Sequence, residues 1–148
     1  MRGGPNRSPE MATVVVDTNV LISALVGHGK PRRLVTKLLT EHVIVTSREM
    51  LAELADVLSR EKFKEVKRGR VNVFLSILVS KAVVVSGIEQ LKVIAEDPDD
   101  DVVLGTAHKG EATYIVTGDK HLLNLKEFRG IRLVSVGSML DLLRSSSP

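Results

Sequence analysis

The sequence contains no cysteine, which excludes disulfide bonds and thiolate metal sites. Any metal ion would therefore be bound by oxygen or imidazole ligands. Tryptophan is also absent, and only 3% of the residues are aromatic although 43% are hydrophobic. The core must consequently consist of Val, Leu, Ile and Ala, and we do not expect a platform of aromatic rings that stacks on nucleic-acid bases.

Long apolar runs are missing as well, since no stretch reaches the ~20 residues that a membrane-spanning helix needs. No secretory signal pattern appears either, so we expect a soluble, cytoplasmic protein. The 148 residues suit one domain with a complete core. The formal net charge of +3 is compatible with a nucleic-acid partner but does not establish one.

Both ends of the chain lack apolar periodicity. Residues 1–11 contain two prolines and two glycines, and we expect a flexible arm there, or a leader upstream of a start at Met11. The serine-rich residues 145–148 are expected to form a disordered tail. Residues 12–144 are predicted to form a single domain, because they contain no internal repeat and no sign of a domain boundary.

Short β-branched runs alternate with helical patterns along this domain. We expect strands at 13–16, 43–45, 83–85, 114–116 and 131–134, and helices at 20–26, 31–41, 47–60, 63–81, 97–109, 119–123 and 138–144. The segment 86–96 is expected to be a loop or a ragged strand, and Thr46 with Glu49 indicates a capping box. The alternation predicts an α/β fold, in which helices cover both faces of a mostly parallel sheet.

The stretch from Ala12 to Ile22 combines a strand, an acid and a helix without a loop between them. Its valines indicate a strand that is buried on both faces. Asp17 follows at the carboxyl end of that strand, where open α/β sheets bind their ligands. The alternative is that Asp17 or Thr18 only caps the helix that follows, which is a common role for both residue types.

Acidic residues occur at three further strand-to-helix junctions, and a parallel sheet brings all such junctions to one edge. Glu53 lies a full turn inside its predicted helix and flanks the apolar stripe, so capping does not explain it. Asp100 shares the apolar face of its helix and should point toward the sheet edge, whereas Asp101 is rotated away from that face. Asp97, Asp99 and Asp119 also fit ordinary capping or first-turn roles.

Carboxylates that meet at one edge repel each other and resist ionising together. A bound Mg²⁺ or Mn²⁺ ion removes this conflict, and both ions prefer carboxylate and water ligands. Such an ion would activate a water molecule for attack on a phosphodiester and neutralise the charge on the leaving oxygen. The sequence therefore indicates metal-dependent phosphoryl chemistry, and it contains no Ser/His/Asp or Cys/His arrangement for nucleophilic catalysis.

Four segments, in this order and spacing, closely resemble the acidic motifs of the PIN domain. They are Val15 to Ile22 with Asp17, Ser47 to Leu54 with Glu53, Asp100 to Ala107, and Val116 to Asp119, and the likeness extends from about Thr13 to Val136. The resemblance implies an α/β/α sandwich with a five-stranded parallel sheet. It also implies a Mg²⁺- or Mn²⁺-dependent nuclease that acts on single-stranded RNA.

The resemblance carries implications for individual residues and for partners. It implies that the metal ligands are Asp17, Glu53, Asp100 and Asp119, with Asn19 and Thr117 as polar neighbours of the metal or its water. The acid-rich run around Asp100 leaves open whether Asp97 or Asp101 also binds the metal. Many compact PIN domains are toxins of type II toxin–antitoxin pairs, which a small antitoxin inhibits and which commonly form homodimers. An RNA-processing role is the alternative.

Basic residues that would contact the RNA backbone fall into two groups, which give affinity without sequence choice. One group follows the third predicted helix and the other opens the second; they are Arg60, Lys62, Lys64, Lys67, Arg68 and Arg70, and Lys30, Arg32, Arg33 and Lys37. The alternative is that both groups are simply solvated faces. In the first group, Glu61 and Glu65 alternate with the basic residues, which favours this alternative.

Three other classes of function fit parts of the pattern. A phosphatase with a strand-end aspartate nucleophile would carry a second aspartate two residues later, where this chain has Asn19. A receiver-type phosphoacceptor would not need Glu53. A non-catalytic RNA-binding module that keeps its acidic edge for structure is the third reading. We also expect self-association through apolar parts of the second to fourth helices, because residues 71–78 are more apolar than a lone surface helix requires.

Overall fold

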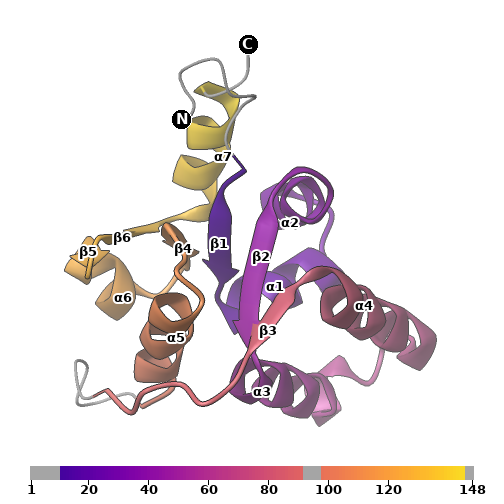
Figure 1. Cartoon of the computed structure of the whole chain (residues 1–148). Coiled ribbons are helices and arrows are strands. Elements are labelled where there is room, and N and C mark those ends of the chain that lie inside the picture. Colours follow the sequence, from indigo (N-terminus) through magenta and orange to yellow (C-terminus); the bar gives the residue numbers. More distant parts are fainter. Residues whose placement is uncertain (1–10, 92–97, 146–148) are drawn as a thin grey trace.

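A computed structural model describes residues 11–91 and 98–145, so the predicted arm up to residue 10 and the tail from residue 146 lie outside the described residues (Figure 1). Helices and strands alternate as predicted. The strands are β1 (Thr13–Val16), β2 (Val43–Ser47), β3 (Val83–Val85), β4 (Tyr114–Val116), β5 (Glu127–Phe128) and β6 (Ile131–Val134). The helices are α1 (Thr18–Val26), α2 (Lys30–Glu41), α3 (Arg48–Leu58), η1 (Glu61–Phe63), α4 (Arg68–Lys81), α5 (Pro98–Lys109), α6 (Lys120–Leu125) and α7 (Val136–Ser145).

The sheet has the strand order β3-β2-β1-β4-β6-β5, and all neighbouring strands are parallel except β5 and β6. The predicted parallel sheet of five strands is therefore confirmed, with β5 as an additional antiparallel edge strand. Its hairpin turns at Arg129 (φ 51°) and Gly130 (φ 83°), which both have the positive φ of a type I′ turn. The sequence did not reveal β5, because two residues followed by Arg-Gly form a weak hairpin signal.

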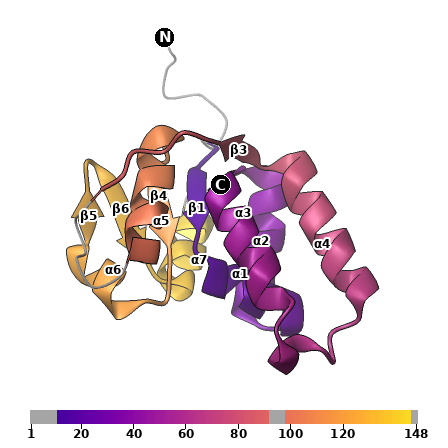
Figure 2. The same cartoon turned by 90° about the horizontal axis from the view of Figure 1, so that it is seen from below.

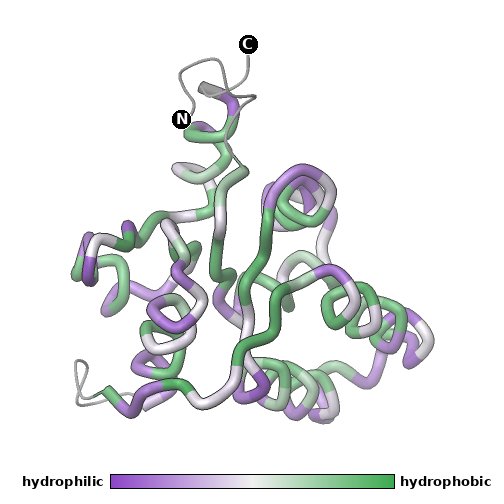
Figure 3. Tube along the Cα trace, viewed as in Figure 1, coloured by the Kyte–Doolittle hydropathy of each residue, from purple (hydrophilic) through white to green (hydrophobic). Residues whose placement is uncertain are grey.

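Two apolar cores lie on opposite faces of the sheet. Val14 and Val16 of β1 belong to the core formed with α1, α2, α3, α4 and α7, whereas Val15 belongs to the core beneath α5 and α6. Figure 2 shows β1 between α5 and the group of α1, α2 and α3. Figure 3 shows hydrophobic residues along β2 and β3. The consecutive valines of β1 are thus buried on both faces of the sheet, as predicted.

Two local predictions were wrong. The N-cap of α3 is Ser47, whose Oγ accepts the Met50 N–H at 3.2 Å, while Thr46 is buried within β2. The strand continues through Thr46, so the capping box expected there does not form. The predicted helix 63–81 is broken into η1 and α4. Residues 64–67 are mostly charged, and they supply too little apolar surface to hold a continuous helix against the core.

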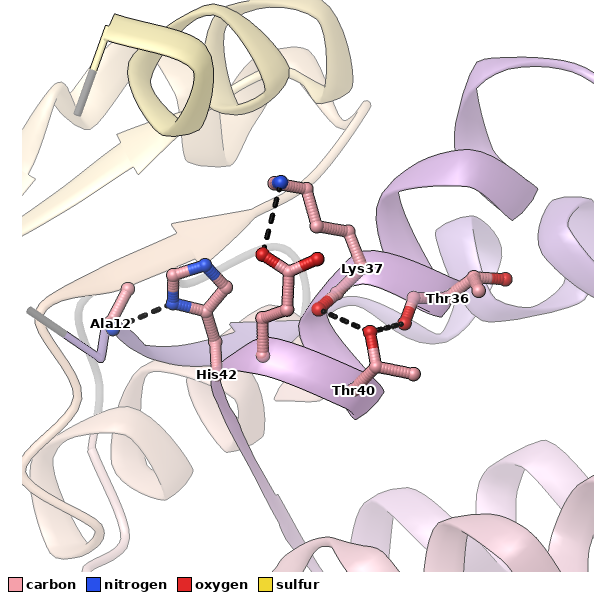
Figure 4. Close-up of polar contacts among 6 residues, drawn as sticks. Ala12, Thr36, Lys37, Thr40 and His42 are labelled. Atoms are coloured by element: carbon pink, nitrogen blue, oxygen red, sulfur yellow. Dashed lines mark hydrogen bonds and ion pairs between the residues drawn. The ribbon is translucent and has the colours of Figure 1, made fainter. Parts of the chain in front are cut away.

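His42 fastens the start of β1 to the end of α2. Its Nδ1 accepts a hydrogen bond from the Ala12 N–H at 3.0 Å, and Lys37 pairs with Glu41 beside it at 3.2 Å (Figure 4). Burial lowers the pKa of His42, against a smaller raising effect of Glu41, so the neutral ring that this bond requires is favoured.

Within the described part of the chain, no helix is both long and apolar enough to cross a membrane.

Candidate metal-binding and catalytic site

The carboxyl ends of β1, β2 and β4 meet at one edge of the sheet. Asp17 follows β1, Ser47 ends β2 and Thr117 follows β4. The Asp17 N–H donates to the carbonyl oxygen of Val116 at 2.9 Å, which holds the ends of β1 and β4 side by side. Side chains that are a hundred residues apart in the sequence are therefore neighbours, as the parallel topology predicts.

Asp17 is buried, with 8% of its surface exposed, and its carboxylate does not cap α1. Its Oδ2 instead accepts a hydrogen bond from the Thr117 hydroxyl at 2.7 Å. The same hydroxyl oxygen accepts the Asp119 N–H at 3.0 Å, so the proton of Thr117 is directed at Asp17. The capping alternative for Asp17 is thereby removed, and Thr117 fixes the orientation of its carboxylate.

Glu53 of α3 lies beside two other acids. Its Oε1 accepts a hydrogen bond from the Thr18 hydroxyl at 3.2 Å. Burial raises the pKa of Glu53, the negative charge of Asp99 raises it further, and Asp17 adds to the effect, while the Thr18 hydrogen bond opposes it. The carboxyl groups of Glu53 and Asp99 also share a hydrogen bond. Three acids from three elements therefore interact at this edge.

Asp99 lies in the first turn of α5, as predicted, but its contact with Glu53 was not foreseen from the sequence. The helix phase was measured from the apolar stripe of α5, which faces the sheet, whereas Asp99 faces α3. Only the packing of α5 against α3 reveals this contact. Asp100, which the sequence places on the apolar face of α5, is buried. Asp101, which the sequence places away from that face, is buried too and lines a cavity of about 530 Å³ with Glu49 and Gln90. Asp97 lies outside the described residues.

Asp119 caps α6, as the capping interpretation of this residue predicted. Its Oδ1 accepts the backbone N–H groups of His121 at 2.7 Å and Leu122 at 3.3 Å. Through its own N–H it is linked to Thr117 and thus to Asp17. Asn19, in the first turn of α1, is exposed. Asp119 therefore borders the acidic edge, with one carboxylate oxygen committed to the helix.

Comparison with known proteins decides the family. The sequence pattern of the PIN domain family matches residues 13–121, which include Asp17, Glu53 and Asp119. The chain belongs to the PIN domain family. Members of this family are typically nucleases and generally depend on a metal ion. The family that the four acidic segments suggested is thus confirmed.

Similar proteins come from archaea and bacteria. MJ1680, an uncharacterized protein of Methanocaldococcus jannaschii, is 30% identical over 118 residues, which cover 77% of this chain and 75% of the relative. PAE2754 from Pyrobaculum aerophilum shares the fold with a TM-score of 0.62 and 18% identity, over 91% of this chain and 90% of the other. VapBC2 from Rickettsia felis, solved with a DNA fragment from their promoter, has a TM-score of 0.59 and 19% identity, over 83% and 98%.

The donor set of this PIN domain suits a hard divalent cation. Carboxylates that contact each other need a shared proton or a cation between them, and oxygen ligands select Mg²⁺ or Mn²⁺. Within residues 11–91 and 98–145, however, no three His, Asp or Glu side chains are arranged closely enough to form a metal-binding group. The fit therefore rests on the chemistry of the acids around Glu53, and not on a preformed cage.

The predicted RNA-binding residues divide into two kinds. Several make contacts within the chain. Arg32 and Arg70 donate hydrogen bonds to the Leu25 carbonyl oxygen at 2.8 and 2.6 Å. The others form ion pairs, Arg60 with Asp56, Lys64 with Glu61 and Lys37 with Glu41, or, for Lys62, a contact with the Phe63 ring. Arg32 and Arg70 thus stabilise the carboxyl end of α1, a role that the sequence analysis did not foresee. Lys30, Arg33, Lys67 and Arg68 are exposed.

Proposed function

We propose that this PIN domain is a Mg²⁺- or Mn²⁺-dependent endoribonuclease that hydrolyses single-stranded RNA. The observation that carries the proposal is the electrostatic coupling of Glu53 to Asp99 and Asp17 at the carboxyl edge of a PIN fold. A carboxyl group such as Glu53, whose pKa is raised by burial and by the charges of neighbouring acids, is typical of functional sites. Such an arrangement is costly for the folded protein and useful once a cation binds.

The residues proposed to hold the ion are Asp17 and Glu53 with Asp99 and Asp100, while Asp119 borders the site and Asp97 and Asp101 stay secondary candidates. When bound, the ion supplies Lewis-acid activation of a water molecule and neutralises charge on the leaving oxygen. Thr117 holds the Asp17 carboxylate, and Thr18 holds that of Glu53. These two hydroxyls orient the acids before the ion arrives, which reduces the cost of binding it.

The exposed cations Lys30, Arg33, Lys67 and Arg68 are proposed to contact RNA phosphates. Contacts of this kind hold the backbone without reading bases, and the chain offers only 3% aromatic residues for stacking. We therefore propose an enzyme with little sequence preference in its RNA. A cytoplasmic location stays a prediction.

Cleavage of a labelled single-stranded RNA with Mn²⁺, with and without a chelator, tests the proposed activity. We expect cleavage that the chelator abolishes. Release of phosphate from a monoester, without RNA cleavage, would favour the phosphatase reading instead. RNA binding without any cleavage would favour the non-catalytic module.

An apolar groove suggests a protein partner, and we propose that it binds a helix of an antitoxin. The groove encloses about 620 Å³ between α1, α2 and α4, and Val73 and Ile77 in its lining are 59% and 38% exposed. Arg32 and Arg70 lie in the same lining, and their hydrogen bonds go to uncharged groups, so their positive charge remains available. The groove therefore fits an apolar helix that carries carboxylates.

Substitution of Val73 by Asp should prevent this complex, because the new carboxylate would lie in an apolar interface. The partner to test is the product of a small reading frame beside the gene, co-expressed with the chain and purified with it. We expect co-purification to be lost in Val73→Asp and retained in Val79→Asp, whose position is 56% exposed but outside the groove. Retention in both variants, or no binding by the wild type, would contradict the antitoxin proposal.

Self-association is proposed at a different surface, the free side of edge strand β3 and the end of α4. Val79, Val83 and Val84 are 56%, 48% and 37% exposed there, and β3 pairs only with β2 in the described sheet. A second copy of the chain fits this surface, because a two-fold contact brings the same valines together. Light scattering of the wild type should give twice the 16.2 kDa mass of one chain, and Val79→Asp should restore the single mass. A wild-type mass of one chain at every concentration would contradict the dimer.

A further inference from the structure

Two buried hydroxyl groups connect the helix that carries Glu53 to the helix that carries Asp99. Ser47 and Thr106 are both fully buried. The Thr106 hydroxyl is within hydrogen-bond distance of Ser47 Oγ (2.9 Å) and of the Val102 carbonyl oxygen (2.8 Å). Ser47 Oγ in turn accepts the Met50 N–H as the N-cap of α3. The first turn of α3 is thus joined to the C-terminal part of α5 by hydrogen bonds between side chains and backbone.

This contact and the acidic contact lie at matching positions along the two helices. Glu53 follows Ser47 by six residues in the direction of α3, and Asp99 precedes Thr106 by seven residues in α5. With a rise of 1.5 Å per residue, these separations are about 9 Å and about 10 Å. The helices are therefore antiparallel and touch at two points, so the position of one contact determines the position of the other.

Apolar packing alone would define this register poorly. The elements that carry Ser47 and Thr106 also contribute Val45, Met50 and Val103 to one apolar cluster, and hydrophobic contacts of this kind are not directional. A hydrogen bond between buried groups is directional and costly to leave unmade. Just after the carboxyl end of α5, a Cβ on Gly110 would clash with the Val45 side chain, so the chain lies close against β2 there as well.

We propose that Ser47 and Thr106 are positioning residues of the nuclease: their hydroxyl contact sets the register of α3 against α5 and thereby brings Glu53 to Asp99 for cation binding. This inference rests on the proposed function. Neither hydroxyl reaches the ion or the RNA in this scheme, because both are fully buried about two helical turns from the acids. They act through Glu53 and Asp99.

The test is Thr106→Val, which keeps the shape of the side chain but removes the hydroxyl. We expect the dissociation constant of Mn²⁺, measured by calorimetry without RNA, to rise about tenfold, the low end of the loss that follows when metal ligands are no longer held in position. The cleavage rate at saturating RNA should fall while KM for RNA stays constant, because the phosphate-binding surface is untouched. Thr106→Ser retains the hydroxyl and should restore Mn²⁺ affinity.

Thr40→Val is the matched control. Thr40 also bonds the carbonyl oxygen four residues earlier in its helix, at 3.0 Å from Thr36, but it lies on the exposed side of α2. Mn²⁺ affinity equal to wild type is expected for this control. Unchanged affinity in Thr106→Val, or failure of Thr106→Ser to restore it, would overturn the positioning role while the wild-type nuclease stands. A wild type that neither binds Mn²⁺ nor cleaves RNA would instead overturn the proposed function, and this inference with it.

Discussion

Replacement of Asp17 by Asn should reduce Mn²⁺-dependent cleavage of single-stranded RNA by at least about 100-fold, the size of effect that loss of one electrostatic contact in an active site typically produces. The substitution removes a negative charge from the carboxyl edge without changing the shape of the side chain. The Asn Oδ1 can still accept the hydrogen bond that Thr117 now donates to Asp17 at 2.7 Å. The fold should therefore be retained, and the change should report on chemistry alone.

Two comparisons make this result specific. Asp141→Asn removes an equivalent charge from the exposed surface of α7, where Asp141 pairs with Arg144 at 3.6 Å, and should leave cleavage unchanged. Thermal unfolding of Asp17→Asn without metal should occur at or slightly above the wild-type melting temperature, because the negative charge of Asp17 contributes to the repulsion at Glu53. Cleavage at the wild-type rate by Asp17→Asn would exclude a catalytic role for this carboxylate, and retained RNA binding would then favour the non-catalytic module.

The arrangement of the sheet could be predicted because its signals are local and repeated. Each of the five parallel strands contains at least two β-branched residues, and each is followed by a helical pattern. That alternation leaves few possible topologies. The edge strand β5 could not be predicted, because two residues carry no periodicity and its pairing with β6 depends on the turn at Arg129 and Gly130.

The site was predictable as far as it depends on strands and not on helix packing. Asp17 and Thr117 follow adjacent parallel strands, so their proximity follows from topology. The contact of Glu53 with Asp99 depends on how α3 lies against α5, which no periodicity in either helix records. The same limit explains why the roles of Arg32 and Arg70 were not predicted. The sequence indicated that they belong to a basic surface, but their side chains donate hydrogen bonds to the carboxyl end of α1 from neighbouring helices.

Glu53→Gln should separate stability from activity. The negative charge of Glu53 is unfavourable in the folded protein, since burial and the neighbouring charges of Asp99 and Asp17 raise its pKa. The neutral amide keeps the hydrogen bond from Thr18 and removes the repulsion, so we expect the melting temperature at pH 7.5 to rise by about 1–3 °C; solvent screening of the half-buried Glu53 limits the gain. RNA cleavage should fall by at least about 100-fold, because a ligand for the ion is lost.

The direction of the pH dependence follows from the raised pKa. The protonated form of Glu53 is favoured on folding, so its contribution to stability is complete below its ordinary value of 4.5 and is lost as the pH rises through the higher folded value. The melting temperature of Glu53→Gln should therefore match wild type near pH 4 and exceed it increasingly toward pH 7.5. Mn²⁺ should reverse the order at pH 7.5 by stabilising the wild type, since it binds only the folded chain.

Glu49→Gln is the control on the same helix. Glu49 is exposed in the first turn of α3, where its charge favours the helix dipole, so its removal should lower the melting temperature slightly and leave cleavage intact. Opposite signs for two Glu→Gln changes one turn apart would distinguish repulsion among the acids around Glu53 from a general effect of charge removal. If Glu53→Gln instead melts below the wild type without metal, repulsion does not dominate there, and the Thr18 hydrogen bond to a charged Glu53 outweighs it.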